Sequence, residues 1–106
     1  MPADLELDFS ANGQTVALAA SQALVLRLEE NPTTGYQWSV TSSGNLRLEA
    51  NDFVPARGPA VGASGLRCQR WRAQGAGTHP LELVYRRAWE PIEKAIGRFE
   101  ILVVSA

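Results

Sequence analysis

Residues 98–104 read RFEILVV, and this stretch predicts the fold class of the whole chain. Phe99, Ile101 and Val103 occupy alternate positions, with polar Arg98 and Glu100 on the opposite face. Because the side chains of a β-strand point alternately to its two faces, this period of two predicts a strand with one buried face. The same period recurs in most other apolar segments, whereas the spacing of an amphipathic helix is rare. We therefore expect an all-β protein.

Turn residues divide the rest of the chain into further short strands. Pairs such as Asn12-Gly13 supply turns because these residue types tolerate the backbone angles of a tight reversal. Seven to eight short antiparallel strands predict an immunoglobulin-like β-sandwich, in which two sheets bury their apolar faces against each other. Trp38 and Trp71 are in phase with apolar neighbours and are expected in the core. Residues 92–96 could form one helical turn, but the segment is too short to support a helix by itself. The other expected strands cover residues 5–9, 14–18, 24–28, 36–40, 46–48, 67–74 and 81–85.

Composition and charge narrow the class of protein. The chain has 106 residues, 45% of them hydrophobic and 20% charged, which predicts a single domain over residues 1–106. With 10 Lys and Arg against 11 Asp and Glu, the formal charge of -1 argues against a nucleic-acid partner.

No apolar run approaches the ~20 residues of a membrane span. The start of the chain lacks a secretion-signal pattern, although a signal already removed would leave no trace, so a periplasmic or secreted location stays open. We expect a soluble domain that is monomeric when free.

Few residues are available for metal binding or catalysis. Cys68 and His79 are the single cysteine and the single histidine, so neither a disulfide nor a cysteine-rich zinc site is expected, and no cofactor is predicted. A Cys-His pair could serve a thiol hydrolase, but a packed thiol and a turn histidine explain these residues as well. Carboxylates such as Asp8 and the Glu29-Glu30 pair are expected to be surface charges, as are Arg70 and Arg72, paired with glutamates across a sheet. We therefore predict a protein that is not an enzyme.

The first of three unusual loops covers residues 31–35, with an aromatic residue after it. Pro32 restricts Asn31 to extended backbone, and Gly35 permits a tight return into the next strand. Such a loop is small at its tip and rigid at its base. A simple strand connection is the alternative interpretation.

Two further loops have residues suited to contact with another chain. Residues 55–65 read as a long exposed loop that ends in GASG, whose small side chains allow close backbone approach, although a merely flexible loop fits too. At residues 87–89, Arg87 and Trp89 belong to the residue types most enriched at interface hot spots. The alternative for Trp89 is that it folds back and caps the core.

In this order and spacing, the three loops resemble those of the chagasin family, protein inhibitors of papain-like cysteine peptidases. The family has an N-P-T-T-G loop, a G-x-x-G loop and an R-P-W loop on an immunoglobulin-like sandwich. The first two motifs match here, residues 76–79 also resemble the family, and the third motif has Ala88 where the family has proline. The resemblance spans nearly the whole chain.

The resemblance implies a reversible inhibitor that blocks the peptidase cleft with a wedge of three loops. The first loop would cover the catalytic cysteine and the other two would flank it. Without proline at position 88, we expect a less preorganised third loop. An immunoglobulin-like adhesion or ligand-binding module that uses the same loops is the alternative. The residues expected to bind the peptidase are Asn31, Pro32, Thr33, Thr34, Gly35, Tyr36, Gly62, Ala63, Ser64, Gly65, Arg87, Ala88 and Trp89.

Overall fold

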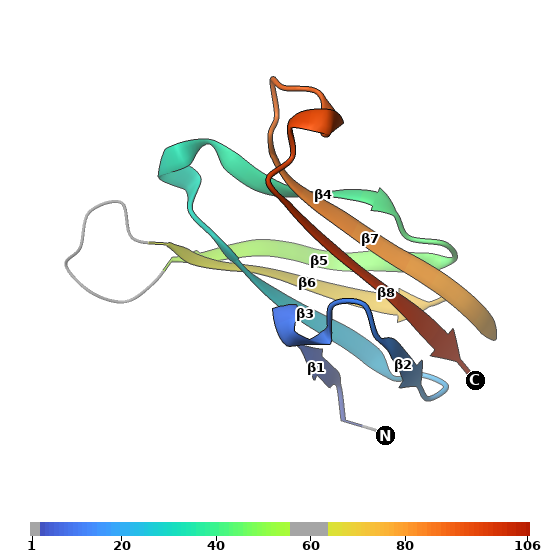
Figure 1. Ribbon diagram of the computed structural model, residues 1–106. Helices are drawn as coiled ribbons and strands as arrows, with labels where there is room; N and C mark the ends of the chain where they lie inside the picture. Colours follow the sequence, from blue (N-terminus) through green and yellow to red (C-terminus); the bar gives the residue numbers. More distant parts are fainter. Residues whose placement is uncertain (1–2, 56–63) are drawn as a thin grey trace.

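The computed structural model describes residues 3–55 and 64–106, and these residues form eight strands in two four-stranded sheets (Figure 1). One sheet has the order β1-β3-β6-β5 and the other the order β2-β8-β7-β4. The predicted all-β sandwich is confirmed. The strands are β1 Leu5–Leu7, β2 Thr15–Leu18, β3 Ala23–Glu30, β4 Tyr36–Ser42, β5 Leu46–Pro55, β6 Gly65–Ala73, β7 Gly77–Arg87 and β8 Gly97–Ser105.

Two of the strand pairings differ from the expected antiparallel arrangement. β1 pairs with β3, and β2 with β8, in parallel, whereas the pairings of β3 with β6, β5 with β6, β4 with β7 and β7 with β8 are antiparallel. The reason is topological: β2 lies in the other sheet, so the chain reverses twice between β1 and β3. Those two strands therefore run in the same direction.

Within the part of the chain that the structure describes, three short 3-10 turns connect strands: η1 Phe9–Ala11, η2 Pro32–Thr34 and η3 Ile92–Lys94. The last of them lies within residues 92–96, where the sequence allows one helical turn. The strand predicted over residues 5–9 is too long, because the Asp8 side chain accepts a hydrogen bond from the Ser10 amide and begins η1 instead. None of the helical segments in the described ranges is long and apolar enough to cross a membrane.

The core lies between the sheets and is built from the alternate residues that the sequence indicates. Trp71 is buried as predicted, and Trp38 is partly buried and packs against the core. Each large side chain that is fully buried contributes about 1.5–3 kcal/mol to the free energy of folding. The buried core residues on the longer strands are Leu24, Leu26, Leu28, Leu46, Trp71, Leu81, Leu83, Phe99, Ile101 and Val103.

The outer face of the first sheet carries ion pairs. Arg70 and Arg72 both lie on this face and contact Glu49, at 3.4 and 3.0 Å respectively. Arg70 also pairs with Asp4. The predicted charged face with cross-strand glutamate partners is therefore confirmed.

Candidate functional site

The strand register brings the three unusual loops to one end of the sandwich. The first loop, residues 31–35, starts where Glu30 pairs with Gly65 and ends where Tyr36 pairs with Arg87. Gly65 also pairs with Pro55, so the two described ends of the second loop lie beside the start of the first. The third loop, residues 87–89, begins at the last residue of β7. The β3–β4 and β7–β8 connections accordingly lie at the end of the molecule away from both termini (Figure 1).

The first loop is held by its own side chains. Asn31 is extended, and its Oδ1 accepts hydrogen bonds from the amide of Thr33 at 3.1 Å and from its hydroxyl at 2.7 Å. Pro32 begins η2, where proline is well tolerated. Gly35 has a φ of 81°, in the left-handed region that favours glycine, and its N–H donates to Pro32 O at 3.1 Å. The tight return predicted for this loop is confirmed, and its base is held by hydrogen bonds from the Asn31 side chain.

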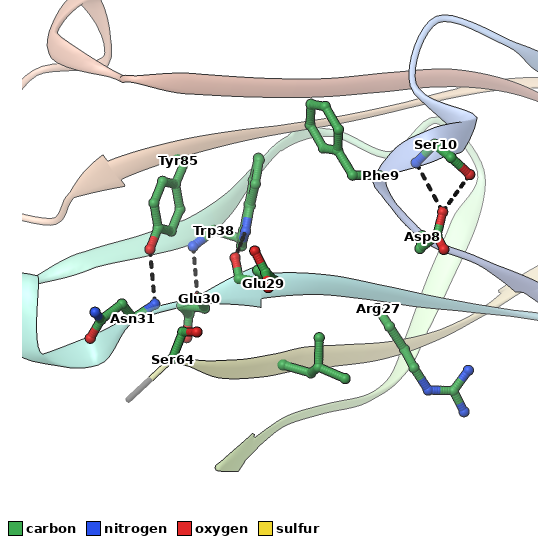
Figure 2. Close-up of a pocket in the computed structure, with 11 residues that line it drawn as sticks. Asp8, Phe9, Ser10, Arg27, Glu29, Glu30, Asn31, Trp38, Ser64 and Tyr85 are labelled. Atoms are coloured by element: carbon green, nitrogen blue, oxygen red, sulfur yellow. Dashed lines mark hydrogen bonds between the residues drawn. The ribbon is translucent and has the colours of Figure 1, made fainter. Parts of the chain in front are cut away.

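A buried carboxylate fixes the base of the first loop. Glu30, expected on the surface, is only 1% exposed because it shares the inward phase of β3. It accepts hydrogen bonds from the Trp38 amide at 2.9 Å and from Nη2 of Arg67 at 2.6 Å (Figure 2 shows the first of these). The Tyr85 hydroxyl accepts from the Asn31 amide at 2.9 Å. These contacts leave the loop little freedom where it leaves β3.

The first and third loops lie against each other. A Cβ atom added at Gly35 would come within 2.5 Å of Cη2 of Trp89, so the indole covers the glycine. The Arg87 Nε donates to Thr34 O at 3.2 Å, and its guanidinium lies over the Tyr36 ring, 4.5 Å from the centroid. Trp89 is 72% exposed, so the alternative in which it caps the core is wrong. Arg87 thus joins the two loops while Trp89 presents a broad apolar surface.

The third loop is a turn secured by an arginine that the sequence did not single out. The Glu90 amide donates to Arg87 O at 3.1 Å, which closes a turn with Ala88 in its second position. Arg86 Nη1 donates to Glu90 O at 2.9 Å and holds the far side of the turn. In the sequence, the role of Arg86 is indicated only by the adjacent pair Arg86-Arg87. A sequence pattern does not show which carbonyl oxygen a guanidinium contacts.

Part of the second loop can be described. Gly62 and Ala63 lie outside the described residues, and Ser64 is exposed. Pro55 and Gly65, expected in the loop, are instead paired with each other as the last residue of β5 and the first residue of β6. A Cβ at Gly65 would lie 2.3 Å from Val54 O, so the close approach of these strands requires glycine.

The structure does not bring Cys68 and His79 together. Cys68 is on β6 in one sheet, in phase with the outward-facing Arg70 and Arg72, and His79 is on β7 in the other sheet. His79 is buried in a strand and not in a turn: its Nδ1 accepts from the Asn45 amide at 3.3 Å and its Nε2 lies 3.3 Å from Gly75 O. Both ring nitrogens therefore serve the fold. A thiol hydrolase site built on this pair is ruled out by the topology.

A β-sandwich whose first and third loops lie against each other at one end, with Trp89 exposed, fits the class of proteins that act by contact with a partner. Residues 17–103 match the sequence model of the chagasin family, described as chagasin family peptidase inhibitor I42. The chain belongs to this family.

One curated protein is similar to the chain in sequence, and two solved structures are similar to it in fold. Chagasin of Trypanosoma cruzi is 29% identical over 84 residues, which cover 74% of this chain and 76% of that protein. The crystal structure of EhICP2, a cysteine protease inhibitor from Entamoeba histolytica, superposes with a TM-score of 0.90 at 22% identity, covering 98% of this chain and 96% of the other. PbICP-C, solved in complex with falcipain-2, has a TM-score of 0.65 at 15% identity and covers 96% and 99% of the two chains.

The family membership bears on three predictions. The resemblance noted from the loop motifs is confirmed, and so are the inhibitory function and the absence of enzymatic activity, because the family consists of peptidase inhibitors. The alternative, an immunoglobulin-like adhesion or ligand-binding module, is not favoured by this family membership.

Proposed function

We propose that residues 1–106 act as one inhibitory domain that binds papain-like cysteine peptidases reversibly and fills their active-site cleft with the three loops. In this proposal the first loop covers the catalytic cysteine. Ser64 with the rest of the second loop lies along one side of the cleft, and Trp89 contacts the other side. The family assignment and the cysteine protease inhibitors among its structural neighbours support this choice of partner.

The observation that carries the proposal is the contact between Trp89 and Gly35. The indole of Trp89 is 72% exposed and lies against the first loop. The Cζ atom of Arg87 lies over it, 6.0 Å from the ring centroid. Aromatic anchors of this kind dominate binding energy when they enter a pocket of the partner. Because the anchor and the first loop are already positioned, little conformational entropy is lost on docking.

The shape of the first loop explains inhibition without cleavage. Thr33 and Thr34 lie in a 3-10 turn whose backbone and side chains are bonded within the loop. Cleavage requires the peptide bond to adopt a near-attack geometry against the catalytic thiolate. A turn fixed by Asn31 and Gly35 resists that rearrangement, so the loop occupies the cleft without reacting.

A titration of active-site-quantified papain tests the proposal. Residual hydrolysis of a small fluorogenic substrate is followed as the protein is added, with a serine peptidase as control. We expect stoichiometric loss of papain activity, recovery on dilution, and no effect on the serine peptidase. Trp89→Ala should weaken inhibition by roughly thirtyfold, about 2 kcal/mol, if Trp89 is an anchor. Full activity of papain and of its relatives at micromolar protein would contradict the proposal.

A further inference from the structure

A pocket of about 710 Å³ opens beside the first loop (Figure 2). Asn31 and Ser64, which belong to the first and second loops, both line it. A partner that lies across these loops therefore also lies over the mouth of the pocket. Nothing in the proposed role of the three loops uses its interior.

Aromatic rings form one wall of this pocket and continue into the loop cluster. The rings of Phe9 and Trp38 are 6.4 Å apart, and those of Trp38 and Tyr85 are 4.9 Å apart. Tyr85 is in turn 5.5 Å from Tyr36, over which Arg87 lies. Phe9 is 49% exposed, so an apolar ring at the pocket remains accessible to a ligand. Aromatic faces and edges of this kind accept both the aliphatic stem of a side chain and a cation.

Among the described charged residues that line the pocket, the ones without an ion-pair partner are negative. Arg27 is bound to Glu6 at 2.6 Å, and Glu30 is satisfied by the buried ion pair at the base of the first loop. Within the described residues, the carboxylates of Asp8 and Glu29 form no ion pair. Hydrogen bonds from the Ser10 hydroxyl and amide hold the pKa of Asp8 below its ordinary value, so it is ionised at neutral pH.

We propose that this pocket takes a lysine or arginine side chain of the peptidase that the three loops engage. The choice of partner rests on the function proposed above. The aliphatic stem would lie against Phe9 and Trp38, and the cationic head would reach the carboxylates of Asp8 and Glu29. An uncharged apolar side chain would leave both carboxylates without a cationic partner, which is why the occupant is a basic residue.

The first experiment tests the chemistry of the pocket in the free protein. Nα-acetyl-arginine amide is titrated while the indole N–H of Trp38 is followed by NMR, because this group donates to Glu29 O at 2.8 Å and reports on the pocket wall. Nα-acetyl-norleucine amide, similar in its apolar stem but uncharged, is the matched probe. We expect the arginine probe to shift this signal and the norleucine probe to bind more weakly.

Matched variants separate the pocket from general charge effects. Glu29→Gln should weaken binding of the arginine probe roughly two- to fivefold. Glu100→Gln, at an exposed residue of β8 outside the pocket lining, should leave it unchanged. Equal binding of the two probes, no response to either, or equal effects of the two variants would overturn the proposal.

A second experiment tests the peptidase as the source of the side chain. The arginine probe is titrated into the complex with a peptidase that the protein inhibits, and we expect the Trp38 signal to respond no longer. Unchanged probe binding in the complex would overturn this occupant while the inhibitory function stands. If the protein inhibits no papain-like peptidase, the proposed function fails and this occupant with it, whereas the probe titration still decides whether the pocket binds a cation.

Discussion

The contact between the first and third loops makes Gly35→Ala the most informative substitution. Gly35 has a φ of 81°, where a residue with a Cβ costs about 1–2 kcal/mol. The added methyl group would also meet Cη2 of Trp89 at 2.5 Å. Because Trp89 is exposed, its indole can move away, so the steric conflict should displace the anchor and not unfold the chain.

Gly13→Ala is a matched control. Gly13 has the same φ of 81°, and a Cβ there meets nothing within 4 Å. Both substitutions should therefore lower the free energy of unfolding by about 1–2 kcal/mol, measured by urea denaturation. Only Gly35→Ala should raise the inhibition constant for papain, by roughly tenfold, through loss of the positioned indole.

A double-mutant cycle isolates the contact. In a Trp89→Ala background the methyl group has no indole to displace, so Gly35→Ala should then change the inhibition constant little. The coupling between the two positions is expected to exceed about 0.5 kcal/mol. Additive effects, or equal inhibition by the Gly13 and Gly35 variants, would refute the reasoning that the two loops act as one preorganised surface.

Three further predictions follow from other contacts. Ala88→Pro places proline where β-turns favour it, so the free energy of unfolding should rise by about 0.4–1 kcal/mol and inhibition should tighten; a lower melting temperature would contradict this. Glu30→Gln leaves Arg67 without its buried partner and should cost roughly 3 kcal/mol in urea unfolding, where a loss below about 1 kcal/mol would count against a structural role. Hydrogen bonds from Arg72, the largest cause, and a second arginine lower the pKa of Glu49 from its ordinary value of 4.5. The free energy of unfolding of the wild type should thus exceed that of Glu49→Gln above pH 4.5, and this difference should vanish as pH falls through the lowered pKa. A difference that does not change with pH would exclude a stabilising role of the ionised Glu49.

Local patterns in the sequence predicted the strands and the first loop. The alternation of Leu24, Leu26 and Leu28 is a property of β3 alone, and the cap by Asn31 and the left-handed Gly35 are settled within five residues. Such features need no knowledge of the rest of the chain. The parallel pairings were missed because periodicity shows which face of a strand is buried and not which strand lies beside it.

Features that depend on distant residues could not be predicted. Glu30 reads as a surface charge because its partner Arg67 is 37 positions away, and only the sandwich brings the two together. The position of Trp89 over Gly35 likewise depends on the pairing of Tyr36 with Arg87. The contacts that hold the third loop are this one and the hydrogen bond from Arg86, where the sequence motif pointed only to a missing proline.

Access to the catalytic thiol of the bound peptidase tests the central claim most directly. Papain is mixed with excess Cys68→Ser protein, which removes the only thiol of the inhibitor, and alkylation of the papain cysteine by iodoacetamide is timed by mass spectrometry. If the first loop covers the thiolate, alkylation should slow to the rate at which the complex dissociates. Alkylation at the rate of free papain, while substrate hydrolysis remains blocked, would show that the loops bind elsewhere and contradict the account.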